Sequence, residues 1–263
     1  MVAAALGPFG TFSHELALRL YGEEPILLPT IAQVFAMAER GEAIGIVPLE
    51  NSEAGGVGPT LDCLCRYCVW ITGEYYLPIH HHLASHSKVE DIRVIYAHPQ
   101  THEQCSEVFD RLAIPIVHTS SNAASAIEAR DQIDAGAVIP GAAAAHYQIP
   151  IIMRDLQNNA SNTTRFIRIE DAAYTGRDPV KCSILIDPSE DIPGLLHRLL
   201  SPFAKRSINL SRIESRPAGR GIGTYRFFLD FEAAPGFLDA LTELRASVPI
   251  REFGCYPTLE VPG

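Results

Sequence analysis

The stretch Ile26-Leu-Leu-Pro-Thr-Ile-Ala-Gln-Val-Phe-Ala-Met-Ala-Glu-Arg-Gly-Glu-Ala-Ile-Gly-Ile-Val47 contains one complete strand, helix and strand unit. Ile26 to Leu28 is a short apolar strand. Thr30-Ile-Ala-Gln33 has the spacing of a capping box, so a helix is expected to begin there and to end at Gly41. Ala43 to Val47 then forms the next strand. A helix between two apolar strands is the building unit of a largely parallel sheet.

The same rhythm continues on both sides of this stretch, from Val2 to about Ile169. It predicts an α/β domain with a largely parallel sheet, divided into two lobes with a cleft between them. The further elements that support this prediction are a strand from Arg93 to Tyr96, a helix after Pro99, a strand from Ile114 to Val117, a helix after Ser120, a strand from Ala135 to Ile139 and an alanine-rich helix to Tyr147.

A second domain is expected after a turn-rich linker, Tyr174-Thr-Gly-Arg-Asp-Pro179, which places the boundary near residue 178. The predicted domains are therefore residues 1–177 and 178–263. The second has the order βαββαβ, the ferredoxin-like arrangement of a four-stranded antiparallel sheet with two helices on one face. Its elements are strands 182–186, 208–215, 225–231 and 251–256 and helices 194–206 and 236–246.

The composition fits a folded protein of two domains. Of the 263 residues 47% are hydrophobic and 20% are charged, and the formal net charge is −10. Binding to the phosphates of a nucleic acid depends on Lys and Arg, so we expect no nucleic-acid partner. An anionic metabolite can still bind in a cleft that is locally positive.

The sequence gives no sign of a membrane or a secretion signal. The segment Met1 to Gly7 lacks a basic flank, and no apolar run reaches the ~18 residues of a membrane span, so the expected location is the cytoplasm. The six cysteines are too sparse for a disulfide framework and are expected to be reduced. Cys63, Cys65 and Cys68 and the run His80 to His82 lack the paired spacing of a zinc site, so no metal is expected.

The segment Asn162-Thr-Thr-Arg-Phe-Ile-Arg-Ile169 places a hydroxyl, a guanidinium and an aromatic ring at the start of an apolar strand. Taken alone, this pattern is typical of an ordinary strand. It nevertheless resembles the Thr-Arg-Phe motif of prephenate dehydratases, and other strings agree in order and spacing. These are Gly7-Pro-Phe-Gly-Thr-Phe-Ser13, Val47-Pro-Leu-Glu-Asn-Ser52, Leu77-Pro-Ile-His-His81 and His98-Pro-Gln100.

The second domain is similar to the ACT domain that accompanies this enzyme. Pro193-Gly-Leu-Leu196 matches the start of its first helix, and Ile208-Asn-Leu-Ser-Arg-Ile-Glu-Ser-Arg-Pro217 matches its Glu-Ser-Arg-Pro strand. The resemblance covers nearly the whole chain and implies a catalytic fold like periplasmic binding proteins of type II. The chain departs from the family pattern at Ala97, at Ile139-Pro140 and in the glycine-rich stretch from Glu53 to Gly58.

The resemblance implies conversion of prephenate to phenylpyruvate without a cofactor. Loss of carbon dioxide and water makes the ring aromatic, so the barrier lies in expelling hydroxide. The enzyme then needs a hydrogen-bond donor at the leaving hydroxyl and anchors for two carboxylates. The family motif assigns the donor role to Thr164. Arg165 is expected to bind a carboxylate with its planar pair of donors, and Phe166 to pack against the ring or the core.

Several polar residues are expected at the cleft because they follow strands that end there. Glu50 is left out of this set, since a carboxylate beside a dianion is unfavourable, and is expected to orient its neighbours. Ser13 could equally be only a helix cap, and His98 could be structural. The predicted substrate-binding residues are Thr11, Ser13, Asn51, Ser52, Asn162 and His98.

The ACT resemblance further implies that L-phenylalanine is an effector. Its site is expected where the helix start at Gly194 meets the strand of a partner chain, so the chain is expected to form a homodimer or homotetramer. The residues that the two family strings contribute are Gly194, Leu195, Leu196, Asn209, Leu210, Glu214 and Ser215.

Two other functions remain open from the sequence. An arogenate dehydratase would act on the amino analogue of prephenate, and a single acceptor for an ammonium group could decide between the two substrates. A sensor of amino or keto acids without catalytic activity could also use a two-lobed fold, because fold alone does not give function.

Overall fold

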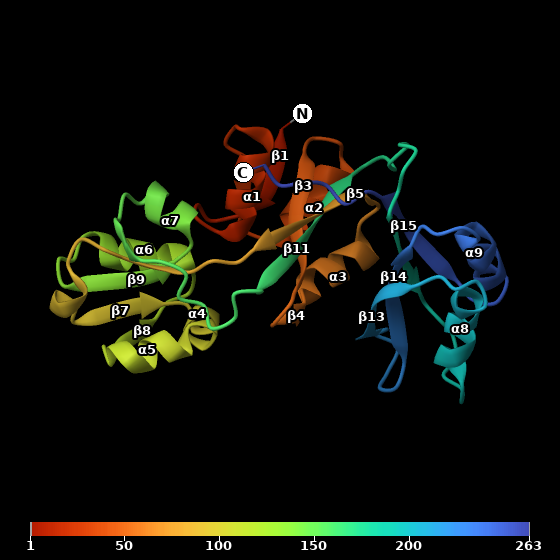
Figure 1. Ribbon diagram of the computed structural model, residues 1–263. Coiled ribbons are helices and arrows are strands. Elements are labelled where there is room, and N and C mark those ends of the chain that lie inside the picture. Colours follow the sequence, from red (N-terminus) through yellow and green to blue (C-terminus); the bar gives the residue numbers. More distant parts are fainter. Residues whose placement is uncertain (1, 263) are drawn as a thin grey trace.

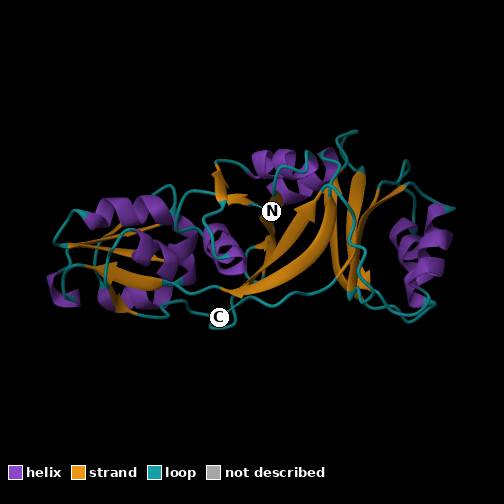
Figure 2. Cartoon of the chain, turned by 90° about the horizontal axis from the view of Figure 1, so that it is seen from above, coloured by secondary structure: helices purple, strands orange, loops and turns teal. Residues whose placement is uncertain are grey.

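The computed structural model describes residues 2–262, which form three sheets arranged one after another along the molecule (Figures 1 and 2). The middle sheet belongs to the first lobe and contains both ends of the first domain's sequence. The second lobe lies on one side of it and the C-terminal domain on the other. None of the helices within residues 2–262 combines the length and the apolar content that a membrane span requires.

The first lobe has the strand order β2-β1-β3-β11-β5, with β4 paired to β3. Only the pairs β1/β2 and β1/β3 are parallel, and β11 runs antiparallel to both of its neighbours. Its elements are β1 (Ala3–Leu6), α1 (Phe12–Tyr21), β2 (Ile26–Leu28), α2 (Ile31–Glu39), β3 (Ile44–Asn51), β4 (Gly55–Gly56), α3 (Gly58–Arg66), β5 (Trp70–Pro78) and β11 (Thr163–Glu170).

The second lobe has the strand order β10-β6-β9-β7-β8, in which β7 pairs in parallel with β8 and β9 while β6 and β10 are antiparallel. Its elements are β6 (His82–Ser85), the 3-10 helix η1 (Val89–Asp91), β7 (Val94–Ala97), α4 (Pro99–Gln104), α5 (Ser106–Leu112), β8 (Ile116–His118), α6 (Asn122–Arg130), β9 (Ala135–Ile139), α7 (Gly141–His146) and β10 (Ile151–Met153).

The prediction of a largely parallel sheet was therefore wrong, because the sheet of each lobe combines parallel with antiparallel strand pairs. The chain leaves the first lobe after β5 and returns to it before β11, and β11 enters between two existing strands in the opposite direction. The local prediction at α2 is confirmed. Thr30 is the N-cap and its hydroxyl accepts from the backbone N–H of Gln33 at 3.3 Å, while Gly41 has the positive φ that ends a helix.

The C-terminal domain has the predicted βαββαβ order and the sheet order β13-β14-β12-β15. Both helices cover one face, and the opposite face packs against the first lobe through Leu185, Phe228, Phe253 and Tyr256. The elements are β12 (Lys181–Ile186), α8 (Leu195–Ala204), β13 (Leu210–Pro217), β14 (Tyr225–Glu232), α9 (Phe237–Arg245) and β15 (Ile250–Tyr256).

Residues 257–261, which belong to the predicted second domain, return to the first lobe. The backbone N–H of Glu74 donates to Pro257 at 3.1 Å, and that of Leu259 donates to the Glu74 carbonyl at 2.8 Å. Leu259 and Val261 pack against the core of the first lobe. The C-terminal segment therefore ties the two domains together.

The expectation of six reduced cysteines is corrected by a disulfide between Cys182 and Cys255. These residues are direct partners in the β12/β15 ladder, although 73 positions separate them in the sequence. The other four cysteines are free. Among the described residues no three His, Cys, Asp or Glu side chains gather as a metal site would require.

Candidate active site

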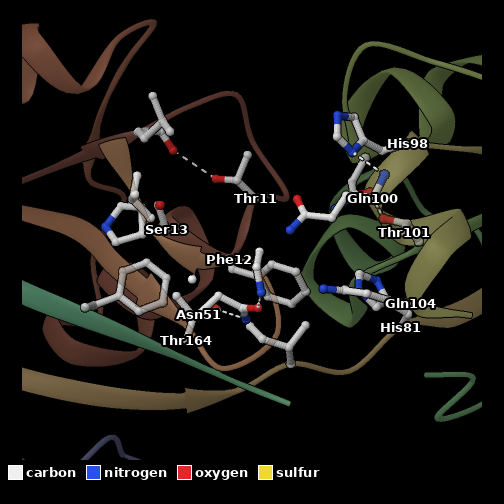
Figure 3. Close-up of a pocket in the computed structure, with 18 of the residues that line it drawn as sticks. Thr11, Phe12, Ser13, Asn51, His81, His98, Gln100, Thr101, Gln104 and Thr164 are labelled. Atoms are coloured by element: carbon white, nitrogen blue, oxygen red, sulfur yellow. Dashed lines mark hydrogen bonds between the residues drawn. The ribbon is translucent and has the colours of Figure 1, made fainter. Parts of the chain in front are cut away.

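A cavity of about 330 Å³ lies between the two lobes (Figure 3). Ligand pockets usually measure roughly 300–1,000 Å³, so the space suits one small molecule. The first lobe contributes the loop before α1, the end of β3, the turn at β4 and the start of β11. The second lobe contributes α4 and the start of α6.

Strand alternation determines which residues of the Thr-Arg-Phe string reach this cavity. Thr164 and Phe166 line it, whereas the side chain of Arg165 points to the other face of β11. Thr164 pairs in register with Asn51 on β3, so both residues stand at the same height of the sheet. Phe166 is buried and also packs in the core of the first lobe.

The amide of Asn51 has a fixed orientation. Its Oδ1 accepts from the backbone N–H groups of Glu53 at 3.0 Å and of Ala54 at 2.9 Å. A carbonyl oxygen alone can accept from these donors, so Nδ2 must face the opposite way. Nδ2 donates to Oγ1 of Thr164 at 3.0 Å and to Oδ1 of Asn162 at 2.8 Å.

This arrangement leaves the hydrogen of the Thr164 hydroxyl unused. Its oxygen accepts from Asn51, and no described residue accepts a hydrogen bond from it. A hydroxyl has one hydrogen to donate, so this hydrogen can point into the cavity. The pair of Asn51 and Thr164 therefore presents a donor to any ligand held there.

The predicted residues Thr11 and Ser13 both line the cavity, but their roles differ. Thr11 is the N-cap of α1. Its hydroxyl donates to the carbonyl of Leu6 at 2.9 Å and accepts from the N–H of His14 at 3.2 Å, so its hydrogen is not available to a substrate. Ser13 lies in the first turn of α1, where backbone N–H groups have no partner within the helix.

Ser52 and Asn162, which were predicted to bind substrate, do not line the cavity. The hydroxyl of Ser52 accepts from the N–H of Thr163 at 3.0 Å. Asn162 is almost fully buried and accepts from Asn51. Both side chains join the ends of β3 and β11 and so support Asn51 from behind.

His98 lines the cavity from the second lobe and is the N-cap of α4, where its Nδ1 accepts from the N–H of Gln100 at 3.3 Å. Burial lowers its pKa, and nearby His118 lowers it further. Sequence reasoning did not select the other polar residues on this side. Only Gln100 carried a signal, as part of the His98-Pro-Gln100 string. The lining side chains missed are Gln100, Thr101, Gln104 and Asn122.

His81 is a further lining residue, which the sequence marked as the end of the Leu77-Pro-Ile-His-His81 string and as part of a histidine run but not as a site residue. It is buried, and its Nε2 lies 3.0 Å from Oε1 of Gln104. Burial lowers the pKa of His81 to about 4, although the contact with Gln104 opposes this shift. The ring is therefore neutral near pH 7, with Nε2–H donating to Gln104.

None of the described lining residues is Asp, Glu, Lys or Arg. Positive potential comes instead from the helices α1, α3 and α6, which all begin at the cavity. The N-terminus of a helix combines free N–H groups with the positive end of its dipole, which favours an anion. The site is thus uncharged in side chains yet suited to a negative ligand.

The departures from the family pattern affect this cavity to different extents. The glycine-rich stretch folds back on β3 as β4, and Gly55, Gly56 and Val57 form part of the wall. Ala97 is buried at the end of β7, next to His98. Neither Ile139 nor Pro140 lines the cavity. Ile139 is the last residue of β9, and Pro140 is the N-cap of α7.

Arg165 is not a carboxylate anchor in this cavity, contrary to the prediction. Its side chain is only 2% exposed and its donors are already taken by Glu50, Glu74, Asp230 and Tyr256. Burial alone would lower the pKa of Arg165, but Asp230, Tyr256 and Glu74 raise it above its ordinary value. Spacing in the sequence could not show that a second domain covers this face of β11.

The predicted effector residues lie in two separate places of the C-terminal domain. Gly194 is the N-cap of α8 with φ 78°, and Leu195 and the half-exposed Leu196 follow it. Asn209, Leu210, Glu214 and Ser215 lie on or beside β13. The ten residues of α8 separate Gly194 from Asn209 by roughly 15 Å of helix, so one chain alone does not bring these two residues together.

The fold and the cavity define a class of protein: a two-lobed α/β domain with a cavity suited to a small anion between its lobes, joined to a ferredoxin-like domain. The family model described as prephenate dehydratase matches residues 3–173, and the ACT domain model matches residues 185–248. The chain belongs to the prephenate dehydratase family.

Individual relatives agree with this assignment. The prephenate dehydratase of Bacillus subtilis is 32% identical, with 99% of this chain and 100% of the relative covered. A prephenate dehydratase from Arthrobacter aurescens, solved in complex with L-Phe, has a TM-score of 0.89 and 30% identity over 98% of this chain and 90% of the other. A structure described as a novel type of quorum quenching acylase has a TM-score of 0.87 and 26% identity, with 98% of both chains covered.

Proposed function

We propose that this protein is a prephenate dehydratase, which converts prephenate to phenylpyruvate, carbon dioxide and water. The observation that carries the proposal is the unused hydroxyl hydrogen of Thr164, held in the cavity by the fixed amide of Asn51. An acylase with a similar fold shows that fold alone does not select the reaction, so the site has to support it.

In the proposed reaction the substrate hydroxyl accepts a hydrogen bond from Thr164. The C–O bond breaks as the C–C bond to the ring carboxylate breaks, and that electron pair enters the ring, which becomes aromatic. Hydroxide leaves and takes up one proton, supplied by solvent, to become water. An alcohol is a weak acid, so Thr164 acts by hydrogen bonding and by relaying this proton rather than as a free acid. The rate gain comes from a donor already aimed at the leaving oxygen.

The two carboxylates of the substrate bind without an arginine or a lysine. The starts of α1, α3 and α6 supply backbone N–H groups, and the amides of Gln100 and Gln104 supply further donors. Each such helix start contributes about 0.3–1 kcal/mol at an exposed site and up to about 2 kcal/mol where it is partly buried. Together they make up for the missing salt bridge.

The same cavity favours prephenate over arogenate. An ammonium group is best bound by a carboxylate, and none of the described lining residues has one. Burying an ammonium without an acceptor is costly. The side chain of the substrate should therefore be the keto acid.

L-phenylalanine is the proposed effector. The ACT domain match and the L-Phe complex of the Arthrobacter relative support this role. No heavy atom lies within 4 Å of the place that a Cβ would take on Gly194, which leaves room for a ligand to approach the backbone at the start of α8. Because Gly194 and Asn209 stand apart in one chain, the proposed site forms between two copies, in a homodimer or homotetramer.

The test is an ultraviolet assay of phenylpyruvate formed from prephenate by the purified chain, with L-phenylalanine titrated in. Turnover that changes on adding L-phenylalanine is the expected result. No phenylpyruvate from a folded protein would contradict the proposed activity. Turnover that does not respond to L-phenylalanine, together with no heat of binding in calorimetry, would contradict the effector only.

A further inference from the structure

A buried group of charges joins the C-terminal domain to the back of the candidate active site. Arg165 is at its centre. Its Nη1 donates to Glu50 at 2.8 Å and to Asp230 at 2.6 Å, its Nε donates to Glu74 at 2.7 Å, and its Nη2 donates to the hydroxyl of Tyr256 at 3.0 Å. Glu50 and Glu74 belong to the first lobe, whereas Asp230 and Tyr256 belong to the C-terminal domain.

Residues of the C-terminal domain complete this group. The hydroxyl of Ser183 donates to Asp230 at 2.5 Å. Lys181 lies 2.9 Å from Glu74, and Arg212 lies 3.0 Å from the second oxygen of Glu50. Asp230 and Glu74 are almost fully buried, so each needs its cationic partner to remain there.

The charged group and the pair of Thr164 and Asn51 lie on opposite faces of the strands β3 and β11. On β11, Thr164 faces the cavity and the next residue, Arg165, faces the C-terminal domain. On β3, Asn51 faces the cavity and the preceding residue, Glu50, contacts Arg165. The ladder pairs Thr164 with Asn51 and Arg165 with Glu50. A displacement of one pair therefore moves the other, because adjacent residues share one backbone.

We propose that Arg165 is a positioning residue, and that Asp230 of the C-terminal domain holds it so that Thr164 and Asn51 keep their geometry. This proposal rests on the proposed function for its kinetic test. The C-terminal domain then supports the catalytic strands directly, and any shift of that domain reaches the hydroxyl of Thr164 through Arg165. The substrate does not touch this group, so its loss should lower kcat more than it raises KM.

The test compares Asp230→Asn with Asp62→Asn. Asp62 and Arg216 form a second ion pair between the same two domains, at 3.0 Å, and Asp62 does not contact Arg165. We expect Asp230→Asn to lower kcat by about tenfold or more with KM changed less than about twofold, since small displacements of catalytic groups are costly. Asp230→Glu, which keeps the charge, should recover part of the loss. Asp62→Asn should leave kcat unchanged.

Amide hydrogen exchange gives a readout that needs no substrate. In Asp230→Asn the segments 48–53 and 161–170 should exchange faster than in the parent, while β7 and β9 of the second lobe should not change. If the parent does not convert prephenate, the proposed function fails and the exchange experiment still tests the positioning. If Asp230→Asn does not fold, two further variants alter the group without removing a charge. Tyr256→Phe removes the hydrogen bonds to Arg165 and Ser183, and Ser183→Ala removes those to Asp230 and Tyr256.

Two results would overturn the proposal. One is equal loss of kcat in Asp230→Asn and Asp62→Asn, which would show a general effect of weaker domain contact. The other is a folded Asp230→Asn protein in which kcat and the amide exchange of β3 and β11 are both unchanged. If Asp230→Asn does not fold, the same result in both Tyr256→Phe and Ser183→Ala would overturn the proposal.

Discussion

Replacing Thr164 by valine removes the proposed hydrogen-bond donor and keeps the shape of the side chain. Thr164 is largely buried, and Asn51 is the described residue that donates to its hydroxyl. After the change, Nδ2 of Asn51 still has Oδ1 of Asn162 at 2.8 Å and the carbonyl of Thr163 at 3.3 Å as acceptors. No buried group loses all of its partners.

Because of these contacts, Thr164→Val should have a small effect on stability and a large effect on kcat. Loss of one hydrogen bond whose donor finds other acceptors should cost about 1 kcal/mol of stability. Loss of a positioned donor to the leaving group should lower kcat by roughly 10²–10⁴-fold, which corresponds to about 3–5 kcal/mol of transition-state stabilisation. Thr164→Val should therefore remain folded and lose nearly all turnover.

The assay measures kcat and KM for prephenate together with the thermal midpoint of the parent and two variants. Thr163→Val is the matched control, because the hydroxyl of Thr163 donates to the carbonyl of Ser161 at 3.1 Å and does not line the cavity. It should keep its kcat. Both variants should melt within a few degrees of the parent. A folded Thr164→Val protein with kcat within threefold of the parent would refute the role of Thr164.

Three further predictions use other parts of the structure. Arg165→Lys should lower the free energy of unfolding in a denaturant titration by more than about 1 kcal/mol. An ammonium group cannot replace the planar set of donors that bind three carboxylates and Tyr256. Unchanged stability would contradict the claim that these buried contacts stabilise the fold. Burial lowers the pKa of His81 to about 4, so the unfolded chain binds a proton at this residue more readily than the folded chain does. The free energy of unfolding should therefore be unaffected by His81 above about pH 6.5 and should fall by roughly 3 kcal/mol as the pH decreases to about 4. His81→Gln should lose less stability over this pH range. Gly194→Ala should abolish the response to L-phenylalanine. Gly236→Ala is the control, because Gly236 has φ 88° at the start of α9 and the variant bears the same backbone strain, yet it should keep the response. Calorimetry showing equal L-phenylalanine binding to both variants would exclude Gly194 from the effector site.

The sequence was most informative where the determinants are local. Thr30 and Gly41 define α2 through capping and a positive φ, which depend only on neighbouring residues. The order of the C-terminal domain also follows from local patterns, because each of its strands and helices is bounded by turn residues. The position of β11 did not follow, since insertion between β3 and β5 depends on contacts with residues about 90 to 120 positions away.

The site was predictable on one side and not on the other. Thr164 and Asn51 carried a family motif, and the structure brings them together at the cavity. Arg165 carried the same motif but faces a second domain, which no local pattern can show. Gln104 and Asn122 reach the cavity from helices of the second lobe, and isolated amides on helices have no sequence signal of their own.

The most direct test of the whole account is competition between prephenate and arogenate in one reaction, with phenylpyruvate and phenylalanine measured as the two products. The cavity offers donors and helix starts for carboxylates but no described carboxylate for an ammonium group. We therefore expect phenylpyruvate to form with the higher kcat/KM. Phenylalanine as the faster product, or neither product from a folded parent protein, would contradict the account.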